Sequence, residues 1–329
     1  MNSLLLVIST EVDKSLTASC ESLPEADNSG RFIDFARNDN GKPMTVLEVL
    51  QATTAYFKQR NIENPRLNAE HLLAHVLQRK RIELYLEFER ELTETELGPL
   101  RDLVKRRSEG EPLQHLLGTV EFCGLTFLCD KRAMVPRPET ERLVELLISN
   151  FKSCQSDSDQ ISKSRIVDVG TGSGVIALSL AAEFPEANIL AVDVSDDALA
   201  LARENGIRLN LSTRVQFLKS RLLETIEGAF DLIVANLPYI STQDRHNLSR
   251  EVLHDPEIAL FAGARGDELV RELIDQAPTR LRPGGMLALE IGLAQSEALL
   301  SALAEKNYRD ICSKNDYTGV TRFLFARYG

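Results

Sequence analysis

From residue 165 onward, apolar residues follow two alternating periodicities. Short runs rich in Val, Ile and Leu are separated by longer segments in which apolar residues recur every three or four positions. The first pattern is typical of buried strands and the second of amphipathic helices. Strands are predicted at 165–169, 188–193, 214–218, 230–235 and 284–291, helices near 174–183, 195–209, 268–281 and 295–305, and a final strand pair at about 308–313 and 321–327. This β-α-β-α order predicts an α/β fold with a parallel sheet covered on both faces.

Residues 44–115 show only the helical period. Capping boxes at Thr45–Glu48 and Thr93–Glu96 indicate two helix starts. The dipeptide Asn64-Pro65 fits a capping residue followed by the first helical position. We therefore expect four or five short helices packed in a small bundle.

Two stretches flank this bundle. Residues 116–135 contain two short strand-like runs around Gly124, which predicts a hairpin linking two domains. Residues 1–43 are rich in Ser, Asn, Asp and Glu without sustained periodicity, which is typical of disorder. The predicted organisation is an extension (1–43), a helical domain (44–115), a hairpin linker (116–135) and an α/β domain (136–329).

A glycine-rich turn joins the first predicted strand to the first helix of the α/β domain. Glycines reach positive φ without a Cβ clash and let the backbone approach a ligand closely. The helix that follows offers unpaired N–H groups and a positive dipole end. A ligand with polar or anionic groups would fit this turn, which consists of Gly170, Thr171, Gly172, Ser173 and Gly174.

The spacing of these glycines distinguishes between ligands. The dinucleotide fingerprint G-x-G-x-x-G/A can be forced onto residues 172–177. The natural pattern is instead an acid, Asp168, followed by three alternate glycines, and it resembles the first motif of Rossmann-like S-adenosylmethionine (AdoMet) methyltransferases. Asp193 ends the next strand, where it can accept hydrogen bonds from a ribose diol. A purely structural turn is the alternative, but alternate glycines cost backbone entropy unless something uses them.

A second chemical motif, Asn236-Leu237-Pro238-Tyr239, directly follows the fourth strand. In a doubly wound sheet, this strand end lies beside the glycine turn. Asn236 can both accept and donate hydrogen bonds, and Pro238 holds Leu237 extended, which fixes the direction of its carbonyl. Tyr239 offers a ring face for stacking. The set suits a planar amide or an amino-aromatic nitrogen, with an ordinary strand-end turn as the alternative.

Charge and composition count against several classes of binding partner. The formal net charge of −11 over 329 residues argues against a broad nucleic-acid surface. The five cysteines show no C-x-x-C spacing, which favours a reduced, cytoplasmic setting. The apolar run Leu4–Ile8 is too short to span a membrane. His71 and His75 have the spacing of a metal pair, but no third ligand is evident, so no metal is expected.

Four segments together resemble one family. They are Glu111–His115, Val135–Glu141, Asn236–Tyr239 and Leu289–Gly292, and they resemble the HemK/PrmC family of protein-(glutamine-N5) methyltransferases. The resemblance covers the chain from about residue 44 to the end. It implies a Rossmann-like AdoMet-dependent methyltransferase sheet with a small N-terminal helical bundle. The implied reaction transfers a methyl group from AdoMet to the side-chain amide N5 of the glutamine in the GGQ motif of peptide chain release factors.

The resemblance also implies roles for residues. It puts AdoMet on the glycine turn and Asp193, and the substrate glutamine on Asn236–Tyr239. A further cofactor contact, an acid plus a bulky residue in the family, falls on Ser220 and Arg221, which do not match that pattern. The residues expected to contact the cofactor are therefore Gly170, Thr171, Gly172, Ser173, Gly174, Asp193, Arg221 and Asn236.

One departure falls within the substrate motif itself. Leu237 stands where the family usually has proline. The resemblance implies that the backbone carbonyl of that residue is used, and leucine also supplies this carbonyl. We therefore expect the function to survive.

Two alternative functions remain. An amino-methyltransferase acting on adenine or cytosine uses similar motif logic, but the acidic balance and the absence of a basic stripe count against it. A non-catalytic AdoMet-binding protein is disfavoured by the intact Asn236 and Tyr239. The expected partner is therefore a release factor, with neither direct nucleic-acid nor membrane binding.

Deleting residues 1–43 should leave stability and activity nearly unchanged, because this stretch lacks the apolar periodicity needed to pack. Thermal unfolding and methylation of a release factor, compared with the full chain, provide the measurement. A large drop in either would show that the extension belongs to the fold.

Overall fold

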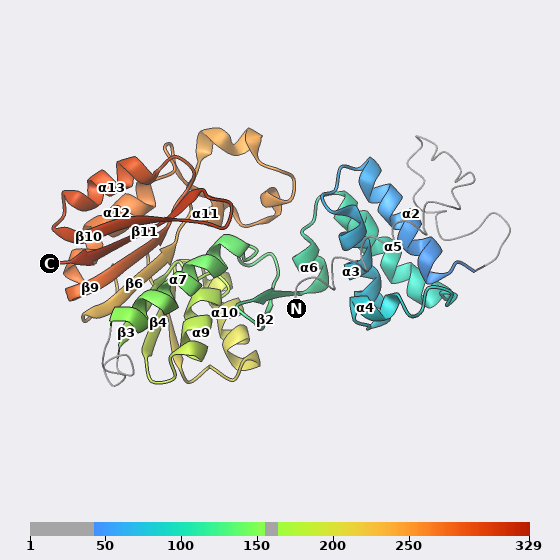
Figure 1. Cartoon of the computed structure of the whole chain (residues 1–329), viewed down its shortest axis with the longest axis horizontal. Coiled ribbons are helices and arrows are strands. Elements are labelled where there is room, and N and C mark those ends of the chain that lie inside the picture. The colour runs from blue at the N-terminus through green and yellow to red at the C-terminus, as the bar shows by residue number, and fades with distance from the viewer. Residues whose placement is uncertain (1–42, 155–163) are drawn as a thin grey trace.

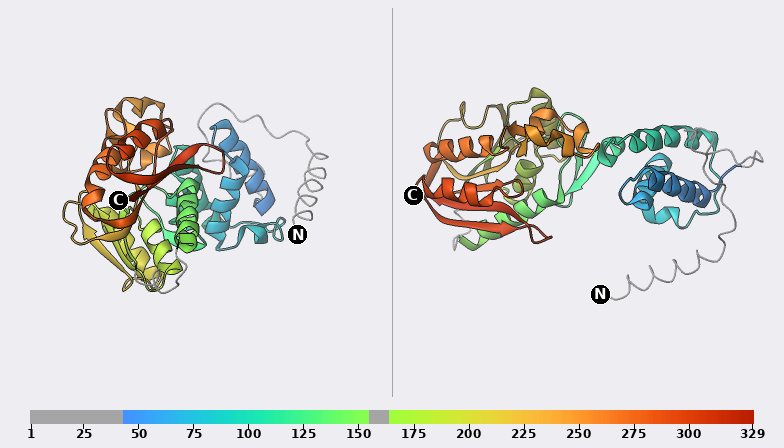
Figure 2. Two further views of the ribbon diagram at one scale, coloured as in Figure 1. Left: turned by 60° about the vertical axis from the view of Figure 1, so that its left-hand side comes forward. Right: turned by 90° about the horizontal axis from the view of Figure 1, so that it is seen from above.

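The computed structural model describes residues 43–154 and 164–329, without the side chains of 151–154 (Figure 1). The expected disorder of the N-terminal extension therefore falls outside the described residues, apart from Pro43. The described chain comprises a helical bundle and a seven-stranded sheet with helices on both faces. Figures 1 and 2 show the bundle beside the sheet, joined to it through a short hairpin.

The described part of the bundle contains five helices around one apolar core. Glu48 accepts a hydrogen bond from the Thr45 N–H at 2.7 Å, and Glu96 accepts one from the Thr93 N–H at 2.9 Å, so both predicted helix starts are confirmed. The predicted N-cap at Asn64 and first helical position at Pro65 are also confirmed, although Asn64 is left-handed (φ 49°) and its side chain makes no capping bond. The helices are α2 (Val46–Gln59), α3 (Pro65–Leu77), α4 (Arg81–Leu84), α5 (Glu94–Ser108) and α6 (Leu113–Leu117).

The predicted hairpin forms between the bundle and the sheet. Strands β1 (Thr119–Phe122) and β2 (Leu125–Leu128) pair antiparallel. The two turn residues, Cys123 and Gly124, both have positive φ (47° and 73°). Two consecutive positive φ angles are typical of the tight turns whose twist matches that of a hairpin.

The sheet has the strand order β10-β11-β9-β6-β3-β4-β5. The first five strands along the chain pair in parallel, and the last two are antiparallel additions at one edge. All seven predicted strands are present, with bounds within three residues of those predicted. They are β3 (Arg165–Val169), β4 (Asn188–Asp193), β5 (Val215–Lys219), β6 (Phe230–Asn236), β9 (Leu281–Glu290), β10 (Tyr308–Asn315) and β11 (Thr321–Tyr328).

Each face of the sheet has its own core, which explains the apolar runs in the strands. Alternate side chains of one strand point to opposite faces, so Ile166 joins one core while Val167 joins the other. Helices α7 (Pro138–Cys154) and α9 (Val175–Glu183) pack on the first face. Helices α12 (Glu268–Gln276) and α13 (Ser296–Ala304) pack on the second. The remaining crossover helix, α10 (Asp196–Arg208), contacts β4, β5 and the hairpin strand β2.

An insertion between β6 and α12 was not predicted. It begins with β7 (Ile240–Ser241) and ends with β8 (Phe261–Gly263), which pair in parallel. Between them lie the 3₁₀ helices Thr242–Asn247 and Val252–His254 and the short helix α11 (Glu257–Leu260).

Two contacts tie this insertion to the rest of the chain. Glu251 of the insertion forms an ion pair with Arg107 of the bundle at 2.7 Å. Asp255 accepts hydrogen bonds from the Val135 N–H and the Arg137 guanidinium, both at 3.0 Å. The insertion is thus attached both to the helical bundle and to the segment that precedes α7. Separately, no helix within the described ranges is long and apolar enough to cross a membrane.

Arg107→Ala should destabilise the protein by about 1.5–3 kcal/mol, the range for hydrogen bonds to charged groups. The Arg107 side chain is 5% exposed and also donates to the Asn68 side chain and the Glu111 carbonyl, so its loss leaves these acceptors without a donor. Lys105→Ala, on the exposed face of the same helix, is the matched control. Thermal unfolding measures both variants, and equal melting temperatures would contradict a role for Arg107 in joining the two parts.

Candidate active site

The glycine turn is held in place by its own side chains and backbone. Gly170, Gly172 and Gly174 all have positive φ, at 73°, 57° and 83°. Asp168 lies fully buried inside the turn, where it accepts hydrogen bonds from the Thr171 hydroxyl at 2.6 Å and the Ala177 N–H at 3.2 Å. Burial raises the pKa of this carboxyl to about 7. Asp168 therefore shapes the turn from within.

Asp193 lies at the adjacent strand end and remains partly exposed. One carboxylate oxygen accepts from the Gly172 N–H and the other from the Ser195 N–H, each at 2.9 Å. A carboxylate has about four acceptor positions, so further donors can still bind. Burial raises the pKa of Asp193 above its usual value, and these backbone bonds oppose the shift.

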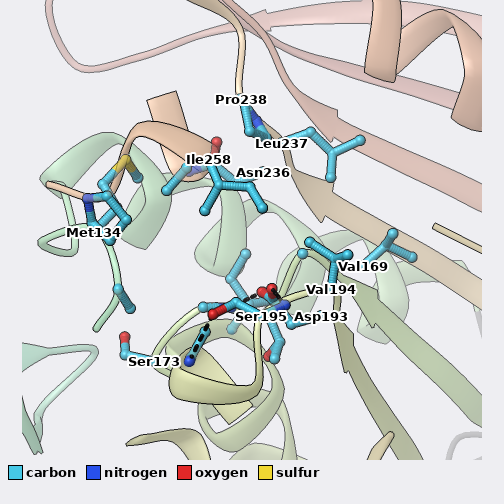
Figure 3. Close-up of a pocket in the computed structure, with 18 of the residues that line it drawn as sticks. Met134, Val169, Ser173, Asp193, Val194, Ser195, Asn236, Leu237, Pro238 and Ile258 are labelled. Carbon is cyan, nitrogen blue, oxygen red and sulfur yellow. Dashed lines mark hydrogen bonds between the residues drawn. The ribbon is translucent and has the colours of Figure 1, made fainter. Parts of the chain in front are cut away.

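A first cavity of about 290 Å³ opens above the glycine turn. In Figure 3, Asn236, Leu237 and Pro238 lie on the opposite side of this cavity from Asp193 and Ser195. The predicted cofactor residues line it, with Gly174 as the exception. Those that do so are Gly170, Thr171, Gly172, Ser173, Asp193, Arg221 and Asn236.

Arg221 differs from the other residues around this cavity. It contributes to the lining, but its guanidinium forms ion pairs with Glu224, at 2.9 Å, and with Glu272. These contacts raise its pKa further above the usual value. The charged end of Arg221 is thus engaged by two acids of its own chain.

A second cavity of about 240 Å³ meets the first at the strand-end motif. Four residues line both cavities: Met134, Asn236, Leu237 and Ala259. Pro238 lines only the first cavity and Tyr239 only the second. The motif therefore forms the wall where the two cavities meet.

The Asn236 side chain has one end occupied and one end free. Its NH₂ group donates to the Thr140 hydroxyl at 2.9 Å, and Thr140 in turn donates to Glu290 at 2.8 Å. Its oxygen accepts no hydrogen bond from the described residues. Burial raises the pKa of Glu290 to about 7. Thr140 and Glu290 belong to two of the segments that suggested the family, but the sequence assigned them no role.

Leu237 packs directly on the glycine turn. A Cβ atom on Gly170 would lie 2.8 Å from the end of the Leu237 side chain, which would have to move, and the φ of 73° further disfavours any residue but glycine. The next part of the motif is fixed by Gln295, which donates to the Tyr239 carbonyl at 3.1 Å. Burial raises the pKa of Tyr239 to about 12, so its ring stays neutral.

The insertion supplies residues that the sequence did not indicate. Pro256, Ile258 and Phe261 line the first cavity, and Leu248 and Val252 line the second. These residues carry no motif and no clear period. Only their tertiary contacts bring them to the site.

Together, the doubly wound sheet, the glycine turn and the strand-end Asn236-Leu237-Pro238-Tyr239 define the class of Rossmann-like methyltransferases. A solved structure with the same fold is the hMettl16 catalytic domain in complex with the MAT2A 3′UTR hairpin 6. It superposes with a TM-score of 0.50 at 17% identity, over 72% of this chain and 83% of that one. This likeness concerns the fold alone.

Sequence comparison defines the family. Residues 48–118 match the PrmC N-terminal domain, and residues 139–265 match the methyltransferase small domain. The release factor glutamine methyltransferase of Rhodopirellula baltica is 38% identical over 88% of this chain and 98% of its own length. That of Geobacter sulfurreducens is 37% identical over 87% and 97%. The chain belongs to the release factor glutamine methyltransferase family, as the resemblance of its motifs predicted.

Proposed function

We propose that this protein transfers a methyl group from AdoMet to the side-chain amide N5 of the glutamine in the GGQ motif of a peptide chain release factor. One observation carries the proposal: Asn236, with a free side-chain oxygen, lies where two cavities meet. One cavity suits the cofactor and the other suits a side chain. Membership of the family supports the same reaction.

The residues around the first cavity fit AdoMet. Asp193 keeps acceptor positions for ribose hydroxyls beyond its two backbone bonds, and the glycine turn allows close backbone approach. Since the Arg221 guanidinium is paired with acids, we expect any contact from that position to come from its backbone. When bound, AdoMet supplies an electrophilic methyl group on its sulfonium.

The substrate amide would occupy the second cavity. A primary amide is a poor nucleophile because its nitrogen lone pair is delocalised. The Asn236 oxygen and the Leu237 carbonyl would accept its two N–H bonds, favour a pyramidal nitrogen and direct the lone pair toward the first cavity. Positioning of this kind is worth about 7–11 kcal/mol at best. The amide proton leaves after the nitrogen has gained positive charge, so no general base is needed beforehand.

We further propose a division of labour along the chain. The helical domain (44–115) would bind the release factor at a distance from the reacting groups. The linker (116–135) would connect this domain to residues 136–329, which would form the methyltransferase domain. Support comes from the bundle's separate core and its ion pair to the insertion that lines both cavities.

The test is transfer of tritiated methyl from AdoMet to purified release factors. A release factor with the GGQ glutamine mutated is the control. Label that depends on this glutamine supports the proposal. Label on an oligonucleotide instead would identify a nucleic-acid amino-methyltransferase, and AdoMet binding without any turnover would identify a non-catalytic protein.

Asp193→Ala should weaken AdoMet binding by about 10- to 100-fold, as expected for lost hydrogen bonds to a charged group. Asp193→Asn keeps one acceptor and should be less affected. The control is Asp196→Ala, which removes an exposed acid paired with Lys219. Calorimetry measures all three, and unchanged affinity in Asp193→Ala would remove this residue from the cofactor site.

Asn236→Ala should abolish methyl transfer with little change in AdoMet affinity. The variant loses the acceptor that holds the substrate amide, whereas the glycine turn and Asp193 stay intact. Asn188→Ala, an exposed asparagine at the opposite end of the sheet, is the matched control. If Asn236→Ala methylated a release factor at near the native rate, the glutamine would not bind where we propose.

A further inference from the structure

Three side chains from different elements form a series of two hydrogen bonds, in which Thr140 and Glu290 are buried and Asn236 is half-buried. Asn236 ends β6, Thr140 lies in the first turn of α7, and Glu290 ends β9. The bonds run from the Asn236 NH₂ to the Thr140 oxygen, and from the Thr140 hydroxyl to Glu290. We propose that Thr140 and Glu290 set the polarity of the Asn236 amide, so that its oxygen and not its NH₂ group faces the substrate. This inference rests on the proposed function.

The direction of the two hydrogen bonds follows from the chemistry of Glu290, the last acceptor in the series. An ionised carboxylate can only accept hydrogen bonds, and a threonine hydroxyl has one hydrogen to donate. Glu290 is 2% exposed, and the Thr140 hydroxyl donates to it. The Thr140 oxygen is left as an acceptor, which selects the NH₂ end of Asn236 as its partner.

The opposite orientation fails at both ends. If the Asn236 amide turned over, its oxygen would need the Thr140 hydrogen, and the buried Glu290 oxygen would lose its donor, which is costly. The NH₂ group of Asn236 would then meet the NH₂ group of the substrate amide, donor against donor. Thr140 and Glu290 are thus positioning residues that act through Asn236, although Thr140 also lines the first cavity and Glu290 the second.

The polarity depends on the charge of Glu290. A protonated Glu290 could donate a hydrogen bond to the Thr140 oxygen. The Thr140 hydrogen would then be available to the Asn236 oxygen, and the direction of both hydrogen bonds would be reversed. Burial and the nearby Glu139 raise the pKa of Glu290, to about 7, whereas Thr140, Arg322 and Asn236 oppose this. The neutral Tyr239 and the guanidinium of Arg137 line the same cavity as Glu290. Because the ionised form is the competent one, turnover should rise as the pH increases through this pKa.

The first test compares Thr140→Val with Thr140→Ser. Valine has a similar shape but cannot hydrogen-bond, so kcat for release-factor methylation should fall by about 10- to 100-fold, the effect of one hydrogen bond to a charged group. Serine keeps the hydroxyl and should recover most of this loss. AdoMet affinity, measured by calorimetry, should stay unchanged in both. Thr53→Val, at a buried threonine of the helical bundle, is the matched control.

The second test uses pH. Glu290→Gln cannot ionise, so the rise in kcat near neutral pH should disappear, although the variant keeps its size. In the wild type, the side-chain NH₂ signals of Asn236 in NMR, assigned by their absence in Asn236→Ala, should shift over the same pH range. They should not do so in Thr140→Val.

The outcomes separate the two proposals. A wild-type protein that methylates no release factor overturns both. A wild type that does so, with Thr140→Val equally active or with the pH rise intact in Glu290→Gln, overturns the polarity proposal alone. If Thr140→Val fails to fold, the pH profile of Glu290→Gln decides.

Discussion

The parallel pairing of β3 with β6 is the constraint on which the site depends. Its register sets Val169 opposite Ala235, so the residues that follow, Gly170 and Asn236, come together where both strands end. Both strands are buried on two faces, and slipping by one residue would exchange the side chains of the two cores. The packing of the sheet therefore holds the glycine turn against the strand-end motif, and the absent Cβ of Gly170 leaves room for Leu237.

The same sheet brings the hydrogen-bonded chain to the site. Asn236 pairs with Glu290 in the register of β6 and β9, so both lie at the edge where the cavities open. Thr140 reaches them because α7 packs on the first face of the sheet. Three segments far apart in the sequence thus contribute one residue each, and each belongs to an element that packs into the buried cores of the sheet.

Much of this architecture could be predicted from the sequence, because it depends on local patterns. Strand bounds follow from apolar runs, and the turn proposed to hold the cofactor follows from glycine spacing. Thr140 and Glu290 could not be linked in this way, since 150 residues separate them and only the tertiary fold makes them neighbours. The insertion was missed for a related reason. Its course depends on distant partners, such as Arg107 for Glu251 and Val135 for Asp255, and not on a period of its own.

Leucine at position 237 shows how packing can replace a covalent restraint. A proline there would fix φ through its ring. Leu237 lacks the ring, but its side chain is 4% exposed and rests against Gly170, while Pro238 keeps its backbone extended. The carbonyl direction is therefore set from both sides, by contact with the glycine turn and by the following ring. Because the turn that would hold the cofactor also holds Leu237, the two halves of the proposed site are coupled through this one side chain.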